Sequence, residues 1–183
     1  DLMRCPDVIT LVKDDESDVL CDMLDEAVSD AVISLNEMRE TEGLTVKADF
    51  ERLIDNIRVH LDMIKQRAPF VIDEYRVKLT KRIEEYLCSV EVDQAKLINE
   101  VAFFADKADI NEEISRLDSH ISQFTDVIES DGEAGRKLDF LAQEMNREIN
   151  TMGSKSADIE LLNHVVEMKN ELEKIREQIR NVE

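Results

Sequence analysis

Four polar side chains between residues 109 and 120 are spaced so that a helix would bring them to one side. Asp109, Glu113, Arg116 and His120 follow one another at intervals of four, three and four residues. At 100° per residue they fall within a sector of about 60°. The neighbouring sector is apolar and contains Ile110, Ile114, Leu117, Ile121, Phe124 and Ile128. Carboxylates beside a core lose part of their hydration and can hold a hard metal ion, and histidine can exchange a proton near neutral pH.

The same spacing also suits a simpler structure. Asp109, Glu113 and Arg116 could form a surface ladder of ion pairs, which adds a few tenths of a kcal/mol per pair on a helix. His120 by itself is more typical of a hydrogen-bonded packing residue than of a ligand. The metal-site interpretation therefore needs a second group of ligands from elsewhere in the chain.

The stretch from Gly135 to Ser156 supplies such a group. Between Ala134 and Lys155, four cations outweigh three carboxylates by one charge, whereas the whole chain has 43 acids, 23 bases and a net charge of −20. The cations are Arg136, Lys137, Arg147 and Lys155, and the carboxylates are Asp139, Glu144 and Glu148. This segment is a neutral-to-basic island in an acidic chain, which favours a functional role.

The polar residues of this island divide between two faces of one helix. Arg136, Gln143, Arg147 and Asn150 share one direction, and their forked donors suit phosphate oxygens. On the other face, Glu144 and Glu148 are four residues apart, so both can reach one metal ion. If this helix packs beside the first, the carboxylates and the imidazole are expected to converge; these are Asp109, Glu113, His120, Glu144 and Glu148.

The elements that must position these side chains are predicted to be helices. The chain has 183 residues, 43% of them hydrophobic, with four Gly, two Pro and no Trp. No alternating strand pattern occurs. We therefore expect an all-α fold of long antiparallel helices in an extended bundle, ending in a coiled-coil-like helix.

Apolar spacing of three and four residues gives the expected boundaries. One helix is predicted from Val19 to Met38, with a break near Gly43. A second pattern begins at Phe50, is interrupted at Pro69 and resumes as far as Tyr86 or Leu87, either as one kinked helix or as two. These segments make up a predicted middle region, residues 1–92.

The predicted C-terminal domain, residues 93–183, carries three further helices. They are expected over Ala95 to Ile128, over Arg136 to Met152 with an end at Gly153, and over Ala157 to Val182. The last of these has a heptad seam that suits a partner helix, either within the chain or in another subunit. The seam consists of Leu161, Val165, Met168, Leu172, Ile175, Ile179 and Val182.

Composition limits the remaining possibilities. Cys5, Cys21 and Cys88 are widely spaced, which argues against a disulfide framework and a structural zinc site. No apolar run reaches the ~18 residues of a membrane span, and no secretory signal is visible, so a cytoplasmic protein without a membrane partner is expected. The acidic net charge opposes general nucleic-acid binding, although divalent cations can carry the positive charge that phosphates need.

Three longer runs resemble one known family. They are ADINEEISRLDSHISQF at Ala108 to Phe124, GRKLDFLAQEMNREINTMGSKS at Gly135 to Ser156, and ELEKIREQIRNVE at Glu171 to Glu183. With RETEG at Arg39 to Gly43, they resemble the C-terminal half of the YicC/YloC family of bacterial endoribonucleases. The matching positions with chemical potential are Asp109, Glu112, Glu113, Arg116, His120, Arg136, Lys137, Asp139, Gln143, Glu144, Arg147, Glu148, Asn150 and Lys155.

This resemblance implies a cytoplasmic endoribonuclease that depends on Mn or Mg, cuts single-stranded or structured RNA, and assembles as a ring-like homo-oligomer, expected to be a hexamer. It also implies an additional N-terminal α+β domain, which the present sequence lacks. If that domain supplies RNA or subunit contacts, the present residues are expected to be inactive alone.

The roles that follow come from side-chain type and spacing. Metal ligands are predicted to be Asp109, Glu113, Asp139, Glu144 and Glu148. Catalytic residues are predicted to be His120, Glu113, Glu144 and Glu148, with His120 as general acid or base. The RNA backbone is expected to be positioned by Arg116, Arg136, Lys137, Arg147 and Lys155.

Two alternatives remain open at this stage. In the first, His120 and a Lys or Arg cleave RNA through its 2′-hydroxyl group without a metal. In the second, the chain is a non-catalytic helical adaptor that recruits other ribonucleases through its acidic faces and heptad seam. His60 and His164 lack comparable polar neighbours in the sequence and are expected to be exposed or packing residues.

Overall fold

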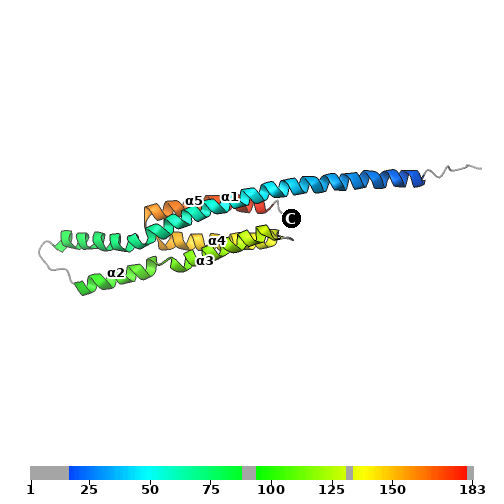
Figure 1. Cartoon of the computed structure of the whole chain (residues 1–183). Helices are drawn as coiled ribbons and strands as arrows, with labels where there is room; N and C mark the ends of the chain where they lie inside the picture. Colours follow the sequence, from blue (N-terminus) through cyan, green and yellow to red (C-terminus); the bar gives the residue numbers. More distant parts are fainter. Residues whose placement is uncertain (1–16, 88–93, 131–133, 181–183) are drawn as a thin grey trace, which may run out of the picture. The chain divides into compact units, whose positions relative to one another are not determined.

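A computed structural model describes residues 17–87, 94–130 and 134–180. The five helices in these ranges are α1 (Ser17–Leu87), α2 (Gln94–Ala108), α3 (Asn111–Glu129), α4 (Gly135–Lys155) and α5 (Ile159–Ile179) (Figure 1). None of the described residues forms a strand, so the predicted all-α fold is confirmed. None of the described helices is both long enough and apolar enough to cross a membrane.

The chain divides into two compact units, Asp1–Thr45 and Val46–Glu183. In the first unit, every side chain from residue 19 to residue 45 is exposed. The predicted apolar stripe is present there on α1, with Leu20 56% and Met38 70% exposed. The second unit contains the hydrophobic core and the candidate site.

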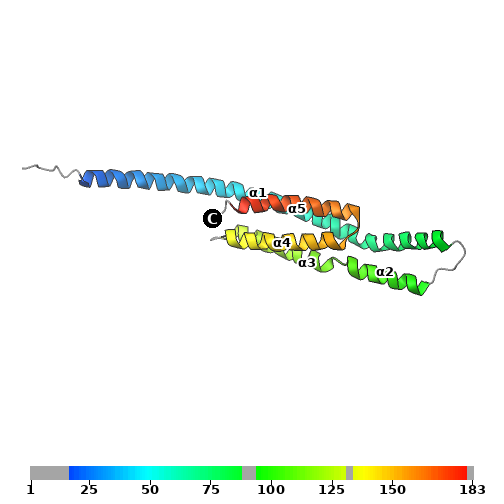
Figure 2. The same cartoon turned by 180° about the vertical axis from the view of Figure 1, so that it is seen from behind.

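The core of the second unit is built from α3, α4, α5 and the part of α1 that follows Val46. Figure 2 shows α3, α4 and α5 packed side by side, as they are in Figure 1. The burial of their apolar faces removes hydrocarbon from water, at about 25 cal/mol per Å². Phe50 of α1 and Phe124 of α3 meet edge to face, with ring centroids 5.7 Å apart.

Polar contacts at the edges of the core show how the helices are aligned. Arg58 donates to Thr125, and Lys65 pairs with Asp118, so α1 and α3 run antiparallel. On the other side of α1, hydrogen bonds from Asn56 to Glu171 and from Arg67 to Asp158 make α5 antiparallel as well.

The heptad seam of α5 lies inside this unit. Its buried members are Leu161, Val165, Met168, Leu172, Ile175 and Ile179. They belong to the same core cluster as the apolar residues of the other three helices. Of the two contacts expected for the seam, the intramolecular one is therefore observed; Val182 lies outside the described residues.

The break predicted near Gly43 does not occur, and of the two alternatives at Pro69 the single helix is observed, because α1 is one helix through both positions. A glycine inside a helix costs only about 1 kcal/mol, and Gly43 keeps the helical conformation. At Pro69 the backbone nitrogen has no hydrogen to donate, and a side-chain contact between residues on either side of the proline is present. Arg67 donates from both terminal nitrogens to Glu74, at 2.6 and 2.9 Å, across the proline.

The helix predicted from Ala95 to Ile128 is instead two helices, α2 and α3. The chain leaves the helix at Asp109, where the side-chain oxygen accepts a hydrogen bond from the backbone nitrogen of Asn111 at 3.0 Å. Aspartate commonly competes with helical hydrogen bonding in this way. Asp109 therefore lies before α3 and not on the helical ridge that the spacing predicts.

The predicted helix end at Gly153 is also wrong, because α4 continues to Lys155. The physical reason for a glycine here is close packing, because a Cβ atom at Gly153 would lie 3.1 Å from Cγ1 of Val165 on α5. The following helix begins at Ile159, two residues later than expected, because Asp158 caps it by accepting from the backbone nitrogen of Leu161.

Candidate metal centre

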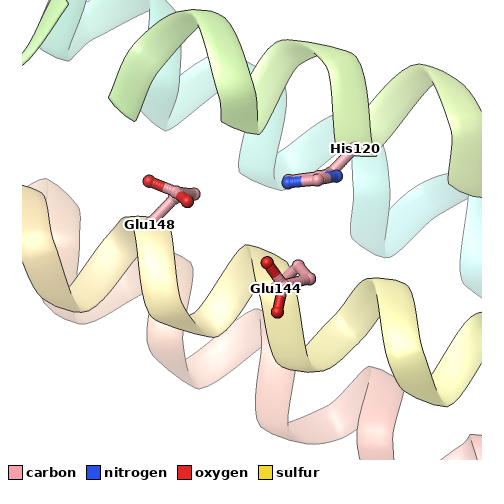
Figure 3. A group of neighbouring side chains, drawn as sticks. All are labelled: His120, Glu144 and Glu148. Carbon is pink, nitrogen blue, oxygen red and sulfur yellow. The ribbon is translucent and has the colours of Figure 1, made fainter. Parts of the chain in front are cut away.

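Three side chains from two helices meet on one side of the second unit. His120 projects from α3, and Glu144 and Glu148 project from α4 (Figure 3). One ligand atom from each residue lies within 4.8 Å of the other two. The convergence that is expected from the polar ridge and the island is therefore observed for these three residues.

Local sequence and helix packing both contribute to this geometry. Glu144 and Glu148 are four residues apart and hence lie on one face of α4. The buried residues Leu117 and Ile121 of α3 and Met145 and Ile149 of α4 hold the two helices together. The polar residues beside these apolar positions are consequently brought to the α3–α4 boundary.

The three side chains are partly withdrawn from water. Glu148 is only 3% exposed, and His120 and Glu144 are half-buried. The Nδ1 atom of His120 is buried and forms no hydrogen bond with any residue in the described ranges. A buried ring nitrogen without a partner beside two carboxylates is a donor set that suits a divalent cation.

Two exposed arginines lie close to the carboxylates. A guanidinium nitrogen of Arg116 is 3.7 Å from Glu148, and one of Arg147 is 3.6 Å from Glu144. Arg116 also pairs with Glu112 one turn earlier on α3. The Arg116 and Arg147 side chains, predicted to contact RNA, thus lie beside the candidate ligands and restrict the orientation of their carboxylates.

Glu113 and Asp109 occupy a separate position near the start of α3. Glu113 is 7% exposed, and Lys155 of α4 approaches its Oε1 atom at 2.8 Å. The same ammonium group donates to the backbone carbonyl of Asp109 at 2.9 Å. Neither carboxylate belongs to the group formed by His120, Glu144 and Glu148.

The remaining predicted site residues lie toward the other end of α4. Asp139 accepts a hydrogen bond from Gln143 at 2.7 Å and is not part of the three-residue group. Arg136 and Lys137 are exposed in the first turn of the helix. The structure therefore distributes the five predicted metal ligands over three places.

A contact between two other histidines is not predicted by the sequence. His60 of α1 and His164 of α5 are half-buried, and their Nδ1 atoms lie 3.1 Å apart. The two residues are 104 positions apart, so no local pattern could have revealed the pair. The one sequence feature that points to the burial of these histidines is that each is next to a core residue, Leu61 or Val165.

Comparisons with known proteins agree with the resemblance in the sequence. Residues 64–183 match the family described as endoribonuclease YicC-like, C-terminal. A protein named probable endoribonuclease YicC from Clostridioides difficile (strain 630) is 47% identical over 182 residues, covering 98% of this chain and 62% of the relative. A protein of the same name from Haemophilus influenzae (strain ATCC 51907 / DSM 11121 / KW20 / Rd) is 33% identical over 183 residues, covering 100% and 63%. The chain thus spans less than two thirds of the length of these relatives.

Proposed function

Because the chain belongs to the YicC-like endoribonuclease family, we propose that it carries the divalent-metal site for cleavage of RNA phosphodiester bonds. The observation that supports this most strongly is the convergence of His120, Glu144 and Glu148, with ligand atoms within 4.8 Å of one another. In this proposal the cation is Mn or Mg. The imidazole ligand favours Mn, because Mg prefers ligand sets of oxygen alone.

The metal ligands supplied by the chain are two carboxylate oxygens and one imidazole nitrogen. When bound, the cation supplies an activated water and neutralises charge at the scissile phosphate. Glu144 and Glu148 carry the negative charge that attracts the cation, and His120 binds it in the neutral form. Arg116 lies 3.7 Å from Glu148 and Arg147 lies 3.6 Å from Glu144, and these contacts limit the rotation of the two carboxylates. In this assignment His120 is a metal ligand. The alternative role for its imidazole is general acid or base.

The experiment compares the purified protein with Glu148→Gln, which removes one ligand charge with little change in volume. We expect Glu148→Gln to weaken Mn binding at least tenfold in calorimetric titrations and to abolish RNA cleavage. The matched control is Glu167→Gln, an identical change at an exposed position of α5, which should leave both properties unaltered.

Removal of the metal by a chelator provides a second test. Cleavage should stop in EDTA and return when Mn is added in excess. Cleavage that persists in EDTA would favour the metal-independent reaction at the 2′-hydroxyl group. If cleavage is lost on purification while Mn binding remains, the activity belongs to a copurifying ribonuclease and the adaptor alternative holds. His120→Ala separates the two roles of the imidazole, because only loss of a ligand weakens Mn binding.

A further inference from the structure

A groove lies between α3 and α4 beside the three-residue group. Gln123 and Asp126 line it from α3, and Arg136, Lys137 and Phe140 line it from α4. The buried Leu141 contributes to the same wall. The groove has a volume of about 440 Å³, within the range of small-ligand sites.

The groove and the candidate metal centre are formed by neighbouring turns of the same two helices. Gln123 follows His120 by three residues on α3, and Phe140 precedes Glu144 by four residues on α4. At 1.5 Å per residue, these separations correspond to about 4.5 and 6 Å along the helices. A ligand strand at the metal centre could therefore extend into the groove without leaving the α3–α4 surface.

Phe140 gives the groove an exposed aromatic surface. Its side chain is 60% exposed, although the adjacent Leu141 is 5% exposed and belongs to the core. Exposed aromatic side chains that flank cationic groups are the usual platform on which unpaired bases stack. Stacking of this kind accepts any base, because each base has a flat aromatic face.

Arg136 and Lys137 give the groove a positive end. Neither forms an ion pair with another residue in the described parts of the chain, in contrast to Arg116, Arg147 and Lys155, whose cationic groups pair with glutamates. In a chain with a net charge of −20, two adjacent cations that pair with no acid in the described ranges are suited to bind an anion. Asp126, on the α3 side, repels phosphate and so directs it toward α4.

We propose that this groove binds one unpaired nucleotide of the RNA strand, with its base on Phe140 and its phosphate at Arg136 and Lys137. The nucleotide is a near neighbour of the phosphate that is cleaved at His120, Glu144 and Glu148. This inference rests on the proposed function and adds a binding position to it.

The test uses a series of single-stranded RNAs of one sequence, each with one abasic nucleotide at a different distance from the cleaved bond. With the wild-type protein, an abasic nucleotide at one position should raise KM about tenfold, which is the usual scale of one base stack on an aromatic side chain. Phe140→Ala should raise KM for intact RNA by a similar factor while kcat changes little. The abasic nucleotide at that position should then have no additional effect.

Control variants separate stacking from general damage. Phe140→Trp should restore most of the affinity, because it keeps an aromatic face. Phe70→Ala removes an equally exposed phenylalanine from α1 and should leave KM unchanged. The double variant Arg136→Gln, Lys137→Gln should raise KM. The slope of log KM against log salt concentration should fall by about 0.7 for each phosphate that the variant no longer neutralises.

Several results would overturn the inference. One is an abasic effect that is the same in wild type and Phe140→Ala. Another is a change of oligomeric state in Phe140→Ala with unaltered KM, which would assign the groove to a protein contact. Failure of the metal proposal is distinguishable, because it appears as unchanged Mn binding in Glu148→Gln, whereas Phe140→Ala should bind Mn as the wild type does.

Discussion

Glu113 and Glu148 are both buried carboxylates at the α3–α4 boundary, but their charges are balanced differently. Glu113 has the ammonium group of Lys155 at 2.8 Å, whereas the nearest cation to Glu148 is Arg116 at 3.7 Å. Burial of a carboxylate is costly unless a partner compensates its charge. The close protein cation at Glu113 indicates a structural ion pair, and the looser arrangement at Glu148 leaves that carboxylate able to bind a further cation.

The Glu113–Lys155 pair leads to a prediction about stability. Lys155→Met should lower the free energy of unfolding by about 2 kcal/mol, because it leaves the Glu113 charge buried without its partner. The loss should be smaller than for a fully buried pair, because the Lys155 side chain is 34% exposed and water screens the interaction. Urea unfolding followed by circular dichroism measures the change.

Two companion variants make this result specific. Adding Glu113→Gln to Lys155→Met should recover much of the loss, because the unpaired charge is removed. Lys169→Met, at an exposed position of α5, should change stability by no more than about 0.5 kcal/mol. Equal losses in the single and double variants would show that packing, and not charge, holds Lys155 in place.

At the level of elements, the start of α5 is tied to α1 by one residue with two roles. Asp158 caps α5 by accepting from the Leu161 backbone nitrogen at 2.9 Å, and it accepts from the Arg67 guanidinium at 2.8 Å. The hydrogen bond from Arg67 is the main reason why the pKa of Asp158 lies below its ordinary value, although burial acts in the opposite direction. The ion pair therefore stabilises the packing of α5 against α1 in a pH-dependent way.

Because the folded-state pKa of Asp158 is lowered, its contribution is complete above the unfolded pKa of about 3.9 and disappears as pH falls through the folded pKa. Asp158→Asn should therefore destabilise the protein at pH 7 and approach the wild-type stability near pH 2. Asparagine caps helices as well as aspartate does, so this variant isolates the charge. Asp158→Ala should cost about 1 kcal/mol more than Asp158→Asn at every pH, because the cap is lost as well.

Denaturant titrations at pH 7, 4 and 2.5 measure these differences. A destabilisation by Asp158→Asn that is the same at pH 7 and pH 2.5 would contradict an ionic contribution.

For the whole molecule, the two compact units differ in how their apolar side chains are covered. In the first unit the stripe from Leu20 to Met38 is exposed, whereas in the second unit one apolar face of α1 is buried in the core. That face consists of Phe50, Leu53, Ile54, Ile57, Leu61 and Ile64. Helices draw most of their stability from packing of an apolar face, and a helix without such packing opens easily. The units should therefore open independently, with different free energies.

Hydrogen exchange followed by mass spectrometry tests this expectation. Amides of residues 19–45 should exchange faster than those of residues 50–64 by a factor on the order of 100. Truncation of the first unit should leave the slow exchange of residues 50–64 unchanged. Equal protection in both ranges would mean that a second copy of the chain covers the stripe in solution.

The parts of the fold that were predicted correctly are those with a local physical cause. Apolar spacing predicted the all-helical structure and the buried seam of α5, because helix period and hydrophobic burial act over one or two turns. Gly153 was misinterpreted for a related reason. A glycine that permits close packing, as Gly153 does against Val165, has the same local signature as one that ends a helix.

A separation of four residues is enough to place Glu144 and Glu148 on one face of a helix, so this part of the site follows from the sequence. The other residues of the site depend on how the helices pack. Antiparallel packing of α3 and α4 places His120 beside Glu144 and Glu148. It also brings Lys155 to Glu113, 42 residues away in the sequence. Asp109 and Asp139 accept hydrogen bonds from other residues. The register of two helices depends on the fit of whole apolar faces, and this fit is not encoded in the spacing of any one polar group.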